Sequence, residues 1–429
     1  MRILVLTNRY PPFFEGAYEL NCHQVAEGLQ ARGHTLIVLT TTFGVKAKVV
    51  DGYVHRLLSY HDSYYRGRLH RRAIQFRLFF QRLRNCWITR RLAEEARPDL
   101  VFIWFSTSIL PILAVQDLGI RTVFRVGGHW LVHLKSEYVG ECSRLKRWYR
   151  SGLIGFRRFE ELEFGAAIMV SETLKESYRQ AGFNVENAVV IPSGIPDGWI
   201  AQQPPGRRSL SEPIRLLYVG RLEAEKGPDV AVRAVEHLIK VQGHRNLYLD
   251  LIGNGRPAFI ETLKRLIASS SLQSVVRLLG FLPRSELIQR YSEYDILLFP
   301  TLRWEGLPMT IVEAMSQGLP VIASDIGGPR DIIEHGRNGF LVTPNDPAEL
   351  AGAIEKIIKT PSLAAEVGWA AIQTVRQKYT FDKMLDQYEA FLESVTPTHA
   401  ETIQLPQPRL GSRIFGRLAH VVGSSPDRR

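Results

Sequence analysis

Short runs of Ile, Val and Leu alternate with helical patterns along most of this 429-residue chain, and no other feature limits its fold as strongly. A strand that is apolar throughout is buried on both faces, as strands of parallel sheets are. Strands separated by helices predict doubly wound parallel α/β layers. The candidate strands lie at residues 2–7, 35–40, 99–105, 121–126, 166–171 and 188–192, and again at 214–220, 247–253, 274–280, 295–300 and 319–324.

A stretch rich in Pro, Gly and Ser, residues 192–213, separates these two sets of strands and has the composition of a linker. We therefore predict two α/β domains with a cleft between them. The predicted boundaries are a first domain at 1–195, a linker at 196–213, a second domain at 214–380, a helix at 381–396 that crosses back to the first domain, and a basic, mobile tail at 397–429.

The composition is that of a globular protein, with 45% hydrophobic and 23% charged residues. The N-terminus lacks the basic head, apolar core and cleavage site of a secretory signal. The longest apolar stretch, residues 101–115, is too short to span a bilayer and is expected to be a buried strand and helix start. Three scattered cysteines fit neither a disulfide framework nor a zinc site, which favours a reducing cytosol.

The net charge of +11 is unevenly distributed. Residues 63–93 contain no acidic residue, and an apolar stripe of Phe76, Phe80, Leu83 and Trp87 recurs there at helical spacing. This pattern is typical of a helix on an anionic membrane, and equally of a solvated helix whose stripe packs on its own domain. Nucleic acid is a third interpretation, although no binding motif accompanies the charge. The arginines expected to face a membrane are Arg66, Arg68, Arg71, Arg72, Arg77, Arg82 and Arg84.

Two glycine-containing turns follow strands of the second half. In "LYVGRLEAEKG" (217–227), Gly220 ends a strand, Arg221 follows and Lys226 precedes a second glycine. Two cations at the carboxyl end of a parallel strand can receive a diphosphate, although such side chains taken alone are more often solvated. In "LIGNGRP" (251–257), Gly253 permits close backbone approach to a ligand.

A further stretch, "WEGLPMTIVEAM" (304–315), places Glu305 just before a helix and Glu313 on it. Pro308 suits a first helical position, and the helical wheel puts Glu313 on a polar face with Thr310 and Gln317. The backbone amides at the start of this helix would hold an anion, with the helix dipole in support.

The chain resembles the retaining group 1 (family 4) nucleotide-sugar glycosyltransferases of the GT-B fold over residues 1–395. The resemblance is carried by these stretches together with "LLGFLPRSEL" (278–287), residues 294–344 and "ARGHTLIVLT" (31–40). The resemblance implies two Rossmann-like domains that face each other across a cleft, the first binding the acceptor and the second the donor. Two glutamates separated by seven residues are that family's signature.

The resemblance also implies roles for individual residues. Glu313 would accept hydrogen bonds from the ribose hydroxyls, and Glu305 would lie beside the donor sugar. Arg221 and Lys226 would neutralise the diphosphate leaving group, so that electrostatic stabilisation of that group is the largest catalytic effect. The expected helper amides are those of Gly306, Leu307, Met309 and Thr310. No cofactor or metal is expected, because the chain has no Asp-x-Asp motif.

The first half departs from the family pattern. The usual glycine pair after the first strand is Gly16-Ala17 here, and Gly127 stands where a family histidine might fall, with His129 two positions on. We assign Gly16 to the donor site and His129 to the catalytic set, while a structural role for His129 remains an alternative. Ser193 replaces the asparagine of the family's hinge.

The predicted function is retaining, metal-independent transfer of a sugar from a UDP- or GDP-linked donor to a glycan or lipid-linked acceptor. The expected context is synthesis of cell-surface polysaccharide or lipopolysaccharide, in the cytoplasm and at the inner face of the plasma membrane. The alternatives are a nucleotide-sugar epimerase of the same fold, and a non-catalytic nucleotide-sugar or membrane-binding protein.

Overall fold

The computed structural model describes the chain apart from residues 15, 61–70, 105–108, 140–161, 205–212 and 397–429. The predicted tail, Arg66 and Arg68 lie outside the described residues, as do the side chains of Arg71, Arg72 and Arg77. The chain forms two compact units. Among the described residues, the first unit contains those within 1–168, 178–189 and 388–396, and the second contains those within 169–177 and 190–387.

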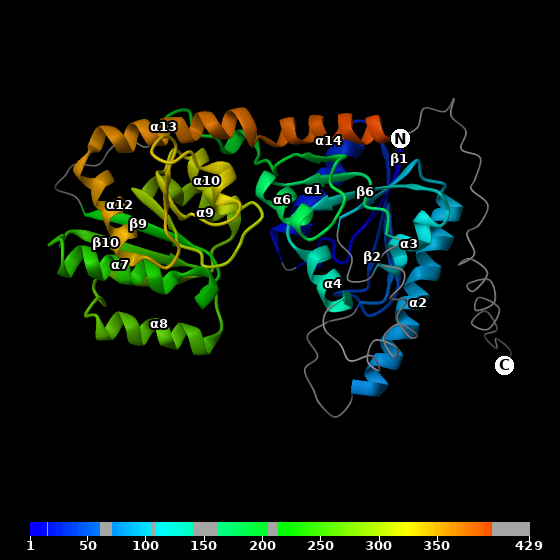
Figure 1. Ribbon diagram of the computed structural model, residues 1–429, viewed down its shortest axis with the longest axis horizontal. Helices are drawn as coiled ribbons and strands as arrows, with labels where there is room; N and C mark the ends of the chain where they lie inside the picture. Colours follow the sequence, from blue (N-terminus) through cyan, green and yellow to red (C-terminus); the bar gives the residue numbers. More distant parts are fainter. Residues whose placement is uncertain (15, 61–70, 105–108, 140–161, 205–212, 397–429) are drawn as a thin grey trace. The chain divides into compact units, whose positions relative to one another are not determined.

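The first unit is built on a sheet of eight strands in the order β3-β4-β2-β1-β5-β6-β7-β8 (Figure 1). β1 pairs in parallel with both β2 and β5, and β5 pairs in parallel with β6, whereas β3 and β4 form an antiparallel edge. The strands are β1 (Arg2–Leu6), β2 (Thr35–Thr41), β3 (Val49–Asp51), β4 (Val54–Leu58), β5 (Leu100–Ile103), β6 (Arg121–Val126), β7 (Ala167–Met169) and β8 (Ala188–Val190). The helices in this part of the chain are α1 (Ala17–Ala31), α2 (Arg71–Ala96), α3 (Leu110–Gln116), α4 (Trp130–Val139) and α6 (Glu172–Gln180).

The second unit is built on a sheet of six parallel strands in the order β11-β10-β9-β12-β13-β14. Its strands are β9 (Ile214–Val219), β10 (Leu247–Ile252), β11 (Val276–Gly280), β12 (Ile296–Phe299), β13 (Val321–Ser324) and β14 (Phe340–Val342). Its helices are α7 (Pro228–Lys240), α8 (Pro257–Ser269), α9 (Arg284–Arg290), α10 (Met309–Ser316), α11 (Pro329–Ile332), α12 (Pro347–Lys359) and α13 (Pro361–Lys378), with single 3-10 turns η2 (Asp197–Trp199), η3 (Ala224–Lys226) and η4 (Tyr291–Glu293). α14 (Phe381–Val395) is divided between the two units after Gln387.

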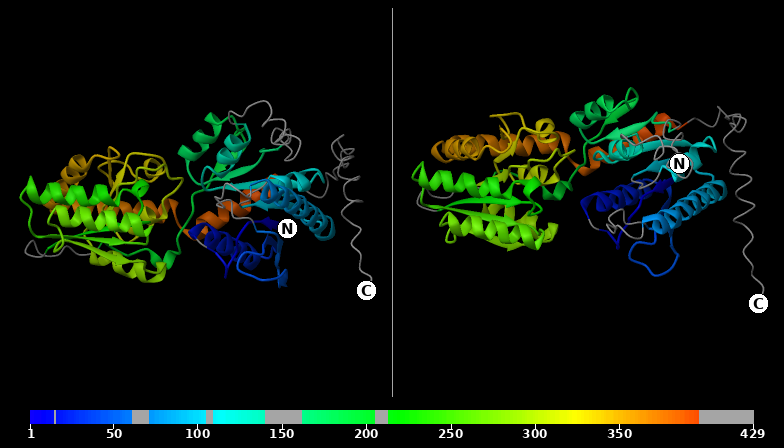
Figure 2. Two further views of the ribbon diagram at one scale, coloured as in Figure 1. Left: turned by 90° about the horizontal axis from the view of Figure 1, so that it is seen from below. Right: turned by 60° about the horizontal axis from the view of Figure 1, so that its bottom comes forward.

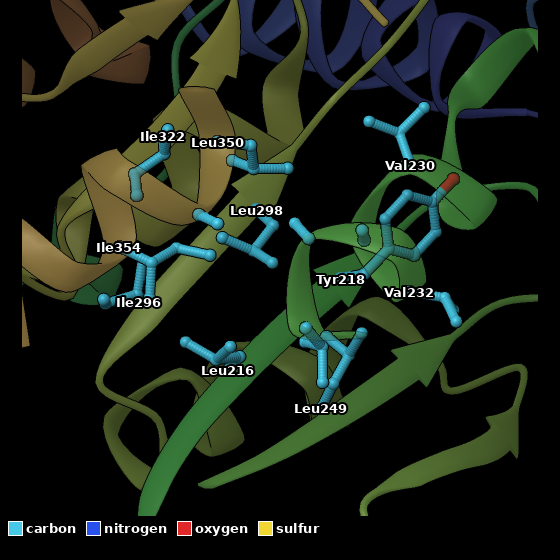
Figure 3. Close-up of a cluster of buried hydrophobic side chains, with 14 of the residues drawn as sticks. Leu216, Tyr218, Val230, Val232, Leu249, Ile296, Leu298, Ile322, Leu350 and Ile354 are labelled. Atoms are coloured by element: carbon cyan, nitrogen blue, oxygen red, sulfur yellow. The ribbon is translucent and has the colours of Figure 1, made fainter. Parts of the chain in front are cut away.

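Helices cover both faces of the six-stranded sheet, so its strands are buried on each side. In β9, Leu216 and Tyr218 pack with α7, α8 and α12, whereas Leu217 and Val219 pack with α10 and α13. Figure 3 shows the first of these two layers, with Val230 of α7 and Leu350 and Ile354 of α12 against the strands. Two further views are given in Figure 2. The prediction of two parallel-sheet α/β domains is confirmed.

Several details differ from the sequence-based expectations. β3, β4 and β14 were not anticipated; they are short, and every residue of β3 is exposed, so none carries a long apolar run. The described residues within 101–115 contribute to β5 and to the buried helix α3, as expected. The described residues include no helix long and apolar enough to cross a membrane.

The segment around Ser193, which was expected to act as a hinge, is hydrogen-bonded to residues 379–381 at the start of α14, within the second unit. Ile195 donates to the carbonyl of Tyr379 (2.9 Å) and accepts from the amide of Phe381 (2.8 Å). Gly194 packs against the backbone of residues 379–381, because an added Cβ would stand 2.3 Å from the carbonyl oxygen of Thr380. Any side chain at position 194 would displace residues 379–381.

α2 buries a different face from the one that the apolar stripe suggested. Its buried residues include Cys86, Ile88 and Ala93, and Cys86 packs on α3. Phe80 and Trp87, by contrast, are 46% and 52% exposed. The alternative in which this stripe packs on its own domain is therefore wrong for these two side chains.

Candidate donor-sugar site in the second unit

The loops that follow the strands of the second unit touch one another through glycines. Gly227 has a left-handed backbone (φ +69°), and an added Cβ would lie 1.9 Å from the carbonyl oxygen of Pro300, in the loop after β12. Gly253, after β10, would meet the carbonyl oxygen of Gly220, after β9, at the same distance. Only glycine permits such contacts, so these residues hold three neighbouring loops in one place.

A fourth loop, after β13, joins this group. The amide of Gly328 donates to the carbonyl of Glu305 (2.7 Å), and a Cβ on Gly328 would stand 2.2 Å from the carbonyl oxygen of Gly306. Ligands of open α/β sheets bind at the carboxyl ends of the strands. The four loops therefore form the natural binding edge of this unit.

At this edge, Lys226 and Glu305 form an ion pair, although they are far apart in the sequence. Their side chains are 16% and 19% exposed, so both remain accessible to a small ligand. The hydroxyl of Tyr218 donates to the carbonyls of Arg221 (3.0 Å) and Lys226 (3.3 Å) and so holds the intervening turn. Burial raises the pKa of Tyr218, which keeps this hydroxyl a donor.

Arg221 is more exposed and takes part in a surface network. It contacts Glu223 (2.6 Å) and Glu225 (3.2 Å), and Glu225 also contacts Arg303 (2.8 Å). The pKa of Glu225 is lowered, first by its hydrogen bond with Arg303. Arg303 was missed by the sequence analysis; the only signal for it was its position two residues before Glu305.

α10 begins at Met309, and Pro308 is its N-cap residue rather than the first helical residue. The prediction was wrong by one position because Pro308 has an extended backbone, with ψ 101°. No side chain caps this helix, and the first amides of a helix lack intrahelical partners. The amides of Met309 and Thr310 are therefore oriented to receive an anion, beside the preceding residues Gly306 and Leu307.

The expectation that Glu313 lies on a polar helix face is wrong. Glu313 is only 6% exposed, and its carboxylate accepts from Nε of Arg284 (2.6 Å) and from the hydroxyl of Tyr291 (3.3 Å). Burial raises the pKa of Glu313, while Arg284 and Tyr291 oppose that rise. Counting positions on a wheel cannot reveal an arginine that lies 29 residues earlier.

The structure thus brings most of the predicted donor residues to one edge, where Glu305 is paired with Lys226 and Glu313 with Arg284. Arg284 and Tyr291 were not among the predicted site residues. Arg284 lies in "LLGFLPRSEL" (278–287), one of the stretches that resemble the family, and Tyr291 lies four residues beyond its end.

The two other predicted site residues, Gly16 and His129, belong to the first unit. Gly16 is the N-cap of α1, with an extended backbone. His129 precedes α4, where its ring lies 6.4 Å from the ring of Tyr178, measured between centroids. The hydroxyl of Tyr178 donates to the carbonyl of Gly128 (2.9 Å) and so holds this loop.

A larger residue at position 127 would displace neighbouring side chains. A Cβ there would lie 2.2 Å from Nη1 of Arg125 and 2.5 Å from the ring of Tyr18. Arg125 is 2% exposed; it donates through Nε to the hydroxyl of Tyr388 (3.2 Å), and its Cζ lies 5.0 Å from the ring centroid of Trp104. Arg125 was also missed, although a charged residue inside the apolar strand "TVFRV" was a visible signal.

Among the described residues, His34, Glu389 and Glu393 place ligand-type atoms within 4.8 Å of one another. Glu389 already accepts from Arg32 (2.7 Å) and pairs with His34 (2.8 Å). These contacts attach the last turns of α14 to the first unit.

Comparison with known proteins places the chain among sugar-transferring enzymes. Residues 202–374 match the family model described as glycosyl transferases group 1, and residues 19–198 match that of glycosyltransferase family 4. The amylovoran biosynthesis glycosyltransferase AmsK of Erwinia amylovora is 34% identical over 178 residues, which are 40% of this chain and 43% of that protein. An uncharacterized glycosyltransferase of Methanocaldococcus jannaschii is 24% identical over 404 residues, which are 90% of this chain and 96% of that protein.

Among solved structures, HepE of Anabaena in complex with UDP and glucose has a TM-score of 0.66 at 19% identity, covering 92% of this chain and 99% of that one. At this identity the likeness shows the fold alone. Two parallel-sheet α/β units of this kind define the GT-B fold, as predicted. The two glycosyltransferase family models together match most of the chain, which supports a glycosyltransferase of the GT-B fold.

Proposed function

We propose that this chain transfers a hexose from a nucleoside-diphosphate sugar, UDP- or GDP-linked, to a glycan or lipid-linked acceptor, with retention of the anomeric configuration and without a metal. One observation carries the proposal: Lys226 and Glu305 meet at the edge where four glycine-packed loops converge. A cation and a carboxylate side by side suit a ligand that combines a diphosphate with a hydroxyl-rich ring.

The mechanism follows from the placement of charge. Lys226 and Arg221 bind the diphosphate, and the amides of Met309 and Thr310 add the positive end of the α10 dipole. Negative charge grows on the diphosphate as the glycosidic bond breaks, so these groups stabilise the transition state more than the ground state. They supply the positive charge that a metal ion provides in other transferases.

Glu305 then exchanges its contact with Lys226 for the hydroxyls of the sugar, beside the anomeric carbon. Glu313 accepts hydrogen bonds from the ribose, because a carboxylate has more acceptor sites than its two present partners occupy. Retention is assigned to attack on the same face of the sugar as the departing phosphate, with no carboxylate nucleophile.

The names of similar proteins support the biological context. AmsK is described as acting in amylovoran biosynthesis, and HepE was solved with UDP and glucose. We extend this to the present chain as a role in the synthesis of cell-surface polysaccharide or lipopolysaccharide at the cytoplasmic face of a membrane.

A panel of UDP-, GDP- and ADP-linked sugars tests the donor. A ligand that binds only the folded chain raises the unfolding temperature, so one nucleotide class should produce a clear upward shift. With that donor and an extracted lipid or glycan fraction, turnover should release nucleoside diphosphate, resist EDTA and give a product with the donor's anomeric configuration by NMR. A flat response to all three donors contradicts the proposal, and an EDTA-sensitive rate contradicts its metal-free form.

The exposed face of α2 supports attachment to an anionic membrane. Phe80, Arg84, Trp87 and Arg91 are exposed at helical spacing, and the Arg91 guanidinium lies 5.5 Å from the Trp87 ring centroid. Aromatic rings enter the boundary between headgroups and chains while arginines bind the headgroups. Arg82 is half-buried on the same helix.

Sedimentation with vesicles containing anionic lipid tests this attachment. The wild type should bind at low salt and dissociate at high salt, and Trp87→Ala with Arg84→Gln should weaken binding about tenfold or more. The exposed Trp369 of α13 offers a control, since Trp369→Ala should leave binding unchanged. Equal binding of the α2 variant and the wild type would remove α2 from the membrane contact.

A further inference from the structure

The carboxylate of Glu313 lies in an environment that disfavours its charge. The side chain is buried, and this burial is the largest influence on its pKa, which is raised. An isolated carboxyl group in such a place tends to take up a proton. A protonated Glu313 could accept fewer hydrogen bonds from a ligand and would itself need an acceptor.

Arg284 is the one cation that contacts this carboxylate among the described residues. It approaches through Nε at 2.6 Å, and its guanidinium carbon lies 4.6 Å from the ring centroid of Trp199. The guanidinium therefore lies over the face of the Trp199 indole, while its Nε donates to the carboxylate of Glu313. Trp199 is itself fixed, since its carbonyl accepts hydrogen bonds from Ser316 (3.4 Å) and Gln317 at the end of α10.

The pairing is incomplete for a purely structural contact. Nη2 of Arg284 is buried and donates to no acceptor in the described part of the chain. A structural arginine on a carboxylate commonly uses two donors, as Arg277 does with Asp250 (both contacts 2.6 Å). Arg284 instead contacts a single oxygen of Glu313, and the other oxygen has only the 3.3 Å contact with the hydroxyl of Tyr291.

We propose that Arg284 is a positioning residue for nucleotide binding: supported by the Trp199 ring, it keeps Glu313 ionised and fixed, so that this carboxylate can accept both ribose hydroxyls of the donor. The inference rests on the proposed function, since it assigns the cause of ribose recognition within that site. Arg284 acts through Glu313 and does not itself touch the ribose.

The pH dependence follows from the groups that face Glu313. These are Arg284 from α9 and Tyr291 from η4, and the pKa of Tyr291 lies well above its usual value, so it does not titrate between pH 6 and 9. Without Arg284, the already raised pKa of Glu313 rises further. The variant would then recover ribose recognition as pH increases and Glu313 loses its proton.

The test compares Arg284→Met with Arg284→Lys by calorimetric titration. The probes are the nucleoside diphosphate that the donor panel identifies and its 2′,3′-dideoxy analogue, each titrated from pH 6 to 9. We expect the wild type to prefer the ribose form by about tenfold to a hundredfold, as for hydrogen bonds to a charged group. Arg284→Met should abolish this preference at pH 6 and regain part of it at pH 9, and Arg284→Lys should retain most of it.

The dideoxy analogue separates positioning from general damage. Its phosphates titrate as those of the parent nucleotide do, so their pH dependence cancels in the ratio. Arg290→Met removes an exposed Arg–Glu pair from the same helix and should leave the ratio unchanged. Thermal unfolding confirms that each variant is folded.

Two results would overturn the inference. In one, Arg284→Met keeps the wild-type preference at every pH; in the other, it weakens both ligands equally, as a merely structural loss would. Either outcome leaves nucleotide binding by the wild type intact. A wild type that binds no nucleoside diphosphate would instead remove the proposed function and this inference with it.

Discussion

The cations near the carboxyl ends of the strands have opposite surroundings in the two units. In the second unit, Lys226 and Arg221 lie on surface loops and are paired with carboxylates that a ligand can replace. In the first unit, Arg125 is enclosed by the aromatic side chains of Tyr18, Trp104 and Tyr388.

This difference indicates which cations can act on a ligand. The ion pairs of Arg221 are at the surface and contribute little to stability, so exchanging their carboxylates for a phosphate costs little. A buried arginine has lost its hydration, so its removal or movement is expensive. The cations of the second unit are therefore available to bind a ligand, whereas Arg125 stabilises the fold of the first unit.

The largest effect is expected from a substitution at the Lys226–Glu305 ion pair of the second unit. Glu305→Gln keeps the shape of the side chain but removes the carboxylate that faces Lys226. We expect the rate of nucleoside diphosphate release to fall about a thousandfold, ~4 kcal/mol in the activation free energy, with an unchanged unfolding temperature.

Glu236→Gln is the matched control for this substitution, since it removes a half-buried glutamate paired with Lys240 on α7, away from the candidate site. It should keep the full rate. A Glu305→Gln enzyme that turns over as fast as this control would refute the mechanism. If Glu305→Gln unfolds the enzyme instead, Glu305 has a structural role, as Arg125 does.

The sequence was informative where a pattern is local. β6 occupies the residues predicted from its apolar run, and Gly220 and Gly253 follow β9 and β10 directly, where the sequence indicated turns. Pairings between distant residues were not accessible. The partner of Glu313, the partner of Lys226 and the enclosure of Arg125 each depend on how the chain brings remote segments together.

A double-mutant cycle tests whether Arg125 is structural. Gly127→Ala places a methyl group against Nη1 of Arg125 and the Tyr18 ring, and overpacking of this kind costs about 1–3 kcal/mol. Arg125→Met removes the hydrogen bond to Tyr388 and costs a similar amount. Because the shorter methionine vacates the space that the new methyl group needs, the double variant should be less destabilised than the sum of the two, as measured by urea unfolding.

Gly128→Ala supplies the control for this cycle, since nothing lies within 4 Å of an added Cβ there. Its free energy of unfolding should be close to that of the wild type. If the costs at positions 125 and 127 simply add, the two residues do not compete for one space, and the reason why the first unit departs from the family's histidine would lie elsewhere.

The smallest expected effect concerns the outer network of the second unit. The pKa of Glu225 is lowered from 4.5, so its pairing stabilises the fold above that pH and the benefit disappears as pH falls below it. Since the group is largely exposed, Glu225→Gln should lower the free energy of unfolding at pH 7 by less than about 1 kcal/mol. The difference from the wild type should vanish in acid.

The same substitution should improve binding, and this outcome separates the two kinds of charge. Glu225→Gln releases Arg221 and Arg303 from a competing carboxylate, so the affinity for a nucleoside diphosphate should rise a few fold. Glu261→Gln on α8, another exposed glutamate beside a lysine, should change neither property. A large loss of stability with no gain in affinity would mean that Arg221 is fixed like Arg125, and the diphosphate would then depend on Lys226 and the α10 amides alone.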